Sequence, residues 1–209
     1  MPLQLQPDTY ALRYMRRTDI AQVALVDQQS FSTPWSASSY AREVSQSHYS
    51  HMLVVERTQQ IPPRNRLHEV WQQFTGASQF EHKLLAYGGL WAFPYEGHIS
   101  TLASHPGVRR QGWGELALLA LLRKAQEMDI WRVSLEVRVS NTRARRLYEK
   151  YGFQERGIKP EYYYDNNEDA YDMRLDLDVP NNQAYIQARY QDYLTRHSLR
   201  DNFTQTAHP

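Results

Sequence analysis

The sequence contains no cysteine among its 209 residues. This excludes disulfide bonds, zinc sites that use cysteine ligands and any catalytic thiol. No apolar run approaches the roughly 20 residues that a membrane-spanning helix needs, and the first residues lack the apolar core of a signal peptide. The formal net charge is only +1, so neither nucleic acid nor an anionic membrane is an expected partner. A cytoplasmic enzyme or binding domain is the expectation that remains.

Strand-like and helix-like patterns follow one another along the chain and indicate one mixed domain. Hydrophobic residues make up 41% of the sequence, which is enough for a substantial core. Runs rich in β-branched and aromatic residues predict strands near residues 51–57, 84–93, 98–106, 130–139 and 170–177. Spacing and capping residues predict helices over residues 20–31, 112–128 and 141–153.

Two segments lie outside this pattern. Residues 58–83 join two predicted strands, which is a long connection, so we expect an insertion. Its helical spacing of apolar residues predicts one short helix, carried by Leu67, Val70, Trp71 and Phe74. Residues 178–209 form a polar C-terminal extension with a possible apolar stripe at Ile186, Tyr190, Tyr193 and Leu194. The domain itself is expected to span residues 10–177.

The segment RRQGWG at residues 109–114 comes directly before a long apolar helix. Glycine lowers helix stability by roughly 1 kcal/mol relative to alanine, so two glycines there suggest that the backbone approaches something closely. A dinucleotide fingerprint fits poorly because HPGVRRQ separates the strand from the first glycine, and the Gly-Lys-Ser/Thr of a P-loop is absent. Backbone N–H groups at a helix start, beside Arg109 and Arg110, would suit a pyrophosphate. The alternative is a tight turn with solvated arginines.

The segment LEVRVSNTRARRLYEKYGF supplies two candidate catalytic side chains. Glu136 alternates with Leu135 and Val137, so it faces away from the apolar side of its strand, toward either solvent or a cleft. Tyr148 lies near the inner stripe of the following helix, where a tyrosine either packs in the core or donates a proton. Neither residue alone decides between these alternatives.

Taken together and in order, these segments resemble the GNAT acetyltransferase superfamily. RRQGWG fits the acetyl-CoA loop, Arg/Gln-x-x-Gly-x-Gly/Ala. FSTPWS, LEVRVSN, LYEKYGF and YYYDNNEDAYDM look like the ribosomal-protein-alanine N-acetyltransferase (RimI) family. The resemblance covers about residues 10–177 without the 58–83 insertion. It implies an α/β (α+β) fold, the GNAT acyl-CoA N-acyltransferase fold, in which a central mixed, mostly antiparallel sheet is flanked by helices.

The resemblance also implies a reaction and the residues that perform it. Acetyl-CoA would be the co-substrate, no metal would be needed, and the acceptor would be the N-terminal alanine amine of a ribosomal protein. A lysine side chain or a small amine is the alternative acceptor. Glu136 would be the general base and Tyr148 the general acid. The acetyl-CoA-binding residues would be Leu102, Ala103, Ser104, Arg110, Gln111, Gly112, Trp113, Gly114, Glu115 and Asn141.

Physical chemistry is consistent with this reaction. Since no cysteine is available, direct attack in a ternary complex is simpler than a covalent relay. The segment YYYDNNEDAYDM would border the acceptor cleft, and its neighbourhood is acidic at Glu161, Asp165, Glu168 and Asp169. We expect these carboxylates to bind basic residues near the start of an acceptor peptide, the alternative being a solvated acidic turn.

Overall fold

The computed structural model describes residues 7–63, 67 and 79–205. In this part of the chain eight strands form one sheet, in the order β6-β7-β5-β4-β3-β2-β1-β8. The strands are β1 (Thr9–Tyr14), β2 (Ser50–Gln60), β3 (Phe80–Phe93), β4 (Glu96–Ser104), β5 (Arg132–Arg138), β6 (Gln154–Tyr163), β7 (Glu168–Asp176) and β8 (Arg200–Asn202). The α-helices are α1 (Ile20–Gln28), α2 (Ala37–Ser45), α4 (Trp113–Glu127), α5 (Thr142–Lys150) and α6 (Pro180–Arg196).

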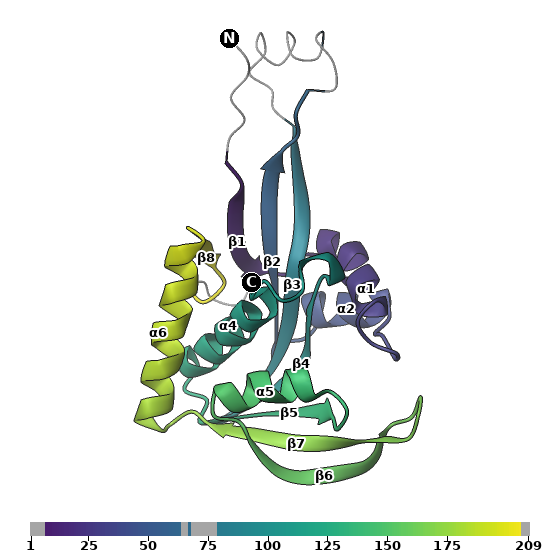
Figure 1. The fold of residues 1–209 in the computed structure, drawn as a ribbon, viewed down its shortest axis with the longest axis vertical. Coiled ribbons are helices and arrows are strands. Elements are labelled where there is room, and N and C mark those ends of the chain that lie inside the picture. The colour runs from purple at the N-terminus through teal and green to yellow at the C-terminus, as the bar shows by residue number, and fades with distance from the viewer. Residues whose placement is uncertain (1–6, 64–66, 68–78, 206–209) are drawn as a thin grey trace.

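The sheet is mixed and mostly antiparallel, as the sequence predicts. Only the β4–β5 and β1–β8 pairs are parallel. Figure 1 shows α1 and α2 on one side of the long central strands and α4 and α6 on the other. The predicted fold class is therefore confirmed.

The alternation of side chains along β2 explains why both faces of the sheet are covered. Met52 and Val54 belong to one buried cluster, which includes residues of α1 and α2. Leu53 and Val55 point to the opposite face and belong to the larger cluster, in which α4 is almost wholly buried. A strand that is buried on both faces needs a continuous apolar run. This is why residues 52–55 read MLVV.

The connection between β2 and β3 is shorter than the predicted insertion. Thr58 pairs with His82 and Gln60 with Phe80, so both ends of the 58–83 segment continue a long antiparallel hairpin. The predicted short helix falls in residues 64–78, of which the structure describes only Leu67. That prediction therefore lies outside the described residues.

The C-terminal extension packs into the main core. Helix α6 lies along α4 (Figure 1), and β8 pairs with β1. Its fully or almost fully buried side chains belong to the same cluster as those of α4 and are Ile186, Tyr190, Tyr193, Leu199 and Phe203. The packed unit thus continues beyond residue 177, because the apolar stripe that the sequence shows at helical spacing is buried against the core.

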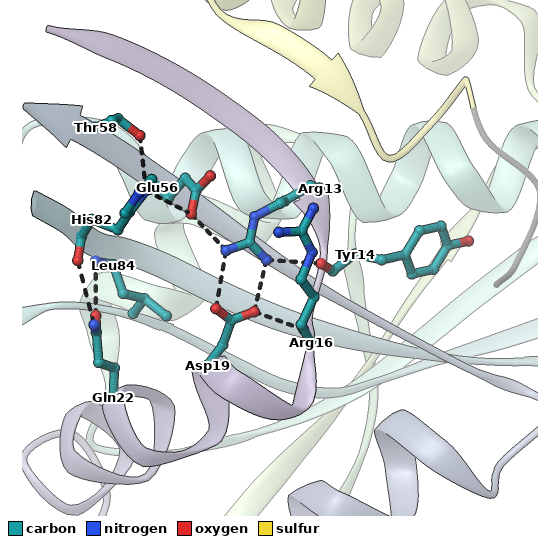
Figure 2. A network of polar contacts seen from close by, with 9 residues as sticks. All are labelled: Arg13, Tyr14, Arg16, Asp19, Gln22, Glu56, Thr58, His82 and Leu84. Carbon is teal, nitrogen blue, oxygen red and sulfur yellow. Dashed lines mark hydrogen bonds and ion pairs between the residues drawn. The ribbon is translucent and has the colours of Figure 1, made fainter. Parts of the chain in front are cut away.

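A network of charged side chains fixes the start of α1 against the sheet (Figure 2). Arg13 on β1 pairs with Asp19 at 2.7 Å and with Glu56 on β2 at 2.5 Å, and all three side chains are largely buried. The Gln22 amide then accepts from the backbone N–H of Leu84 on β3 at 3.3 Å. Since α1 leads into the FSTPWS segment, this network helps to set the position of that segment.

Candidate active site

The two parallel strands in the middle of the sheet separate and open a cleft. Strands β4 and β5 pair only from Glu96 to His98 of β4, which face Arg132 to Ser134 of β5. In Figure 1, β4 runs upright and β5 runs across the lower part of the molecule. Beyond His98 no strand of the described residues pairs with the side of β4 that faces β5. Backbone groups of β4 therefore remain available for binding in the cleft.

Two cavities of about 560 Å³ each occupy this opening. One lies between the end of β4, the start of α4 and α5, and the other lies between β4, β5, the α1–α2 connection and the β6–β7 hairpin. Leu102, Asn141 and Tyr148 line both cavities, so the two are parts of one cleft. A ligand in each cavity would meet the other ligand beside these shared residues.

The first cavity is built to bind an anion. Gly112 is the N-cap of α4 and adopts a left-handed backbone with φ of +90°. The first intrahelical hydrogen bond is donated by Leu116 to the Gly112 carbonyl, so the N–H groups of residues 113–115 precede it. These N–H groups and the helix dipole favour negative charge. Arg110, also left-handed with φ of +67°, adds a cation at the cavity edge.

Most of the predicted acetyl-CoA-binding residues come together here. Those that line the first cavity are Leu102, Ala103, Ser104, Arg110, Gly112, Trp113, Gly114, Glu115 and Asn141. Gln111 does not line it and instead accepts a hydrogen bond from the Trp113 indole at 3.3 Å. The residues of the sequence motif thus line one cavity, apart from Gln111, whose side chain contacts Trp113 within the loop.

Three of these side chains are already used inside the protein. The Trp113 ring is buried between Tyr10, at 5.1 Å between ring centroids, and His197, at 4.6 Å. The Asn141 side chain caps α5 by accepting from the backbone of Ala144. Because the Trp113 ring is buried, this residue can contact a ligand only through its backbone.

The Glu115 carboxylate is the third predicted acetyl-CoA-binding side chain that is engaged within the protein. It accepts hydrogen bonds from Lys150 at 2.6 Å and from the Tyr151 hydroxyl at 2.5 Å. Burial by itself would raise the pKa of Glu115, but these hydrogen bonds and the charge of Lys150 lower it below its ordinary value. Glu115 is consequently an ionised anchor between α4 and α5, which leaves its backbone for the cavity.

Glu136 lies in the second cavity with its side chain only 10% exposed. Its Oε1 lies 2.5 Å from Lys159 Nζ on β6, and its Oε2 lies 3.3 Å from His98 Nε2 on β4. The hydrogen bond to Glu136 raises the pKa of Lys159. Burial lowers the pKa of His98, although the Glu136 charge opposes this shift. Glu136 is therefore a carboxylate directed into the cleft by one ammonium and one neutral imidazole.

Sequence reasoning missed both partners of Glu136. His98 could have been noticed, because it lies on β4 four residues before Leu102, which the motif does identify. Lys159 gave no signal, because its proximity to Glu136 depends on β7 lying between β6 and β5. Neither residue was among the predicted site residues.

Tyr148 lies where the two cavities meet and is 8% exposed. Its ring contacts Phe153, with 5.7 Å between centroids. Burial raises the pKa of Tyr148 well above its ordinary value. The phenol therefore keeps its proton at neutral pH.

The acidic residues of the β6–β7 hairpin are largely engaged within the protein. Arg138 binds Asp165 at 2.7 Å and Glu168 at 3.0 Å, and it also donates to the Ser32 hydroxyl at 2.7 Å. Asp169 accepts from the backbone N–H of Glu161 at 2.9 Å. Arg138 thus already pairs with Asp165 and Glu168, two of the four carboxylates that we expected to bind a basic acceptor. For Glu161 and Asp169 the expectation stays a prediction.

A buried carboxylate that the sequence did not reveal shapes the opposite side of the second cavity. Asp27 is 1% exposed and accepts from the backbone N–H of Trp35 at 2.6 Å and from the Tyr40 hydroxyl at 2.8 Å. It also accepts from the Tyr87 hydroxyl. These bonds hold the FSTPWS segment against α2 and β3, where Trp35 lines the cavity.

The described residues contain no cluster of three or more His, Asp or Glu side chains arranged to hold a metal ion. In the same part of the chain no helix is both long and apolar enough to span a bilayer. The chemistry of the cleft is therefore argued from its side chains and backbone groups alone.

Comparison with known proteins identifies the class to which this cleft belongs. Residues 41–153 match the acetyltransferase (GNAT) family. The chain belongs to this family and is an acetyl-CoA-dependent N-acetyltransferase. The matched segment contains the separated strands, the glycine loop and both candidate catalytic residues.

Particular relatives narrow the resemblance to the alanine N-acetyltransferases of ribosomal proteins. A protein of Bacillus subtilis, provisionally named ribosomal protein bS18-alanine N-acetyltransferase, is 34% identical over 160 residues, which cover 77% of this chain and 91% of the relative. The N-alpha-acetyltransferase RimI of Mycobacterium tuberculosis is 27% identical over 172 residues, which cover 79% of this chain and 92% of the relative. The predicted family resemblance is confirmed.

Solved structures support the same fold. The ribosomal-protein-S18-alanine N-acetyltransferase from Escherichia coli superposes with a TM-score of 0.63 at 24% identity, covering 80% of this chain and 94% of that one. Ard1 from Thermoplasma volcanium gives a TM-score of 0.60 at the same identity. At this identity the superpositions show that the fold is shared.

Proposed function

We propose that this protein transfers the acetyl group of acetyl-CoA to the α-amine of the N-terminal alanine of a ribosomal protein, by direct attack in a ternary complex. The observation that carries the proposal is the single cleft with two compartments. An anion-binding helix start lies in one compartment, Glu136 lies in the other, and Tyr148 lies between them. Such a protein would act in the cytoplasm, where ribosomal proteins are made.

The first compartment fits acetyl-CoA. Its pyrophosphate would accept from the N–H groups at the start of α4, with Arg110 adding positive charge. The unpaired edge of β4 at Leu102–Ser104 would bind the extended pantetheine arm through backbone groups. When bound there, acetyl-CoA supplies the activated acyl group as a thioester.

The second compartment supplies the acid and base. Glu136, through water, would take the proton that the attacking amine loses, and Tyr148 would give a proton to the departing thiolate. An unpaired N–H of β4 beyond His98 would stabilise negative charge on the acyl oxygen. Holding the amine against the acyl carbon contributes much of the acceleration.

The chemistry favours an α-amine as the acceptor. An α-amine has a pKa of about 7.7–8.0, whereas a lysine side chain has one of about 10.4, so the α-amine is far more often neutral at pH 7. The relatives named for alanine N-acetylation of bS18 point to the same acceptor class. Glu136 is already bound to Lys159, so it is better suited to the α-amine, which loses its proton more readily than a lysine side chain.

The direct test offers the purified protein three related peptides with labelled acetyl-CoA. The first begins with a free alanine, the second has that amine blocked, and the third is blocked but contains an internal lysine. We expect label only in the first peptide, on its α-amine, as located by fragment-ion mass spectrometry. Equal labelling of the internal lysine would replace this proposal with the alternative of a lysine or small-amine acetyltransferase.

A further inference from the structure

The C-terminal extension contacts the predicted pyrophosphate loop at three points. The Tyr193 hydroxyl of α6 lies against Gly112, where a Cβ atom would come within 2.8 Å of it. His197, just after α6, packs on the Trp113 ring. Arg189 of α6 lies 3.8 Å from the Glu115 carboxylate. Helix α6 therefore reaches the same turn that would bind acetyl-CoA.

The contacts of the extension involve parts of the loop other than the backbone N–H groups that would bind acetyl-CoA. The ring of Trp113 packs between Tyr10 and His197, and the carboxylate of Glu115 binds Lys150 and Tyr151. The backbone N–H groups of residues 113–115 remain at the start of α4. Gly112 has no side chain in the place where the Tyr193 hydroxyl lies. The extension thus supports the loop from behind.

Tyr193 makes two of these connections at once. Besides covering Gly112, Tyr193 lies close enough to Glu115 for the charge of that carboxylate to act on its phenol. Burial, together with the charge of Glu115, raises the pKa of Tyr193 to about 12, so the phenol stays protonated. Glu115 in turn binds Lys150 and Tyr151, so Tyr193 contacts the Gly112 turn and neighbours the carboxylate that joins α4 to α5.

We propose that Tyr193 is a positioning residue for acetyl-CoA, holding the left-handed turn at Gly112 and the first turn of α4 in the geometry that binds the pyrophosphate. This proposal rests on the proposed function, since it assigns a residue outside the matched family segment to the same site. An anion held by backbone N–H groups needs those groups fixed before it binds, because mobile groups must be ordered at a cost in affinity.

The test compares two tyrosines of α6 that each lose one hydroxyl. Tyr193→Phe removes the hydroxyl that lies against Gly112, and Tyr190→Phe removes a 2.8 Å hydrogen bond to Asp201, on the β8 side of the same helix. We expect Tyr193→Phe to weaken acetyl-CoA binding about three- to tenfold by calorimetry. The KM for acetyl-CoA should rise by a similar factor, with kcat and the peptide KM unchanged. Tyr190→Phe should lower the Tm but leave acetyl-CoA affinity at the wild-type value.

A second variant covers the case in which Tyr193→Phe does not fold. Arg189→Gln removes the ion pair between α6 and the Glu115 carboxylate and should weaken acetyl-CoA binding about twofold. The proposal is overturned if Tyr193→Phe binds acetyl-CoA as tightly as the wild type, or if Tyr190→Phe weakens binding by the same factor. Calorimetry needs no acceptor, so a wild-type protein that fails to bind acetyl-CoA would instead refute the proposed function.

Discussion

Replacing Gly112 by alanine should destabilise the fold, whereas the same change at Gly114 should not. Gly112 has a φ of +90°, and an L-residue in a left-handed conformation costs roughly 1–2 kcal/mol. The new Cβ would also lie 2.8 Å from the buried Tyr193 hydroxyl, and relieving such a clash costs roughly 1–3 kcal/mol. The expected loss of stability is therefore roughly 2–5 kcal/mol.

Gly114 is the matched control within the same loop. It lies in the first turn of α4, and the nearest atoms to an added Cβ are those of Ser104, at 3.7 Å and beyond. Alanine there meets ordinary van der Waals contact and gains up to about 1 kcal/mol of helix propensity. The Tm of this variant should equal that of the wild type or rise slightly.

Thermal unfolding followed by circular dichroism measures the difference. For a protein of this size 1 kcal/mol corresponds to roughly 2–4 °C, so Gly112→Ala should lower the Tm by roughly 4–20 °C. Equal Tm values for the two variants, or a larger loss at Gly114, would refute the assigned backbone conformation. A Gly112 variant also cannot report acetyl-CoA contact alone, because the fold needs glycine there as well.

Other changes test the chemistry, the extension and the ionisation of the hairpin. Tyr148→Phe should lower kcat about 100-fold or more while acetyl-CoA affinity, measured by calorimetry, is kept, because only a proton donor is lost; a wild-type kcat would assign Tyr148 to packing. Glu136→Gln should also lower turnover, with partial recovery as the pH passes about 8 and the α-amine loses its own proton; a pH profile parallel to that of the wild type would argue against a base. Deleting residues 180–209 removes side chains buried against α4, so the cooperative thermal transition should be lost; a truncated protein that melts like the wild type would show that the extension is dispensable. Hydrogen bonds from Ser140 and Arg138 lower the pKa of Glu168 to about 2, below the value of about 4.3 in an unfolded chain. Its stabilising contribution should therefore be complete above about pH 5 and lost as the pH falls through about 2, and an ordinary midpoint in an NMR titration of the Glu168 carboxyl carbon would contradict the Arg138 pairing.

Local patterns in the sequence determined the turn that begins α4 and the direction of the Glu136 side chain. The glycines of RRQGWG at the start of a long apolar helix indicated an anion-binding turn, and Gly112 is indeed the left-handed cap of α4. The two-residue period of β5 directed Glu136 away from the core, and the structure places it in the cleft. These features depend on neighbours within a few residues, which is the range over which strand and helix periods are visible in a sequence.

Only the tertiary structure decided what surrounds those residues. The cleft exists because β4 and β5 stop pairing after His98, and no local pattern in either strand marks that point. Lys159 lies beside Glu136, and Arg138 forms an ion pair with Asp165 of the hairpin, because of the order of strands in the sheet. The contact between Tyr193 and Gly112 joins residues 81 positions apart in the sequence. Such contacts follow from the packing of whole elements, which minimises exposed apolar surface over the entire chain, so no short stretch of sequence contains them.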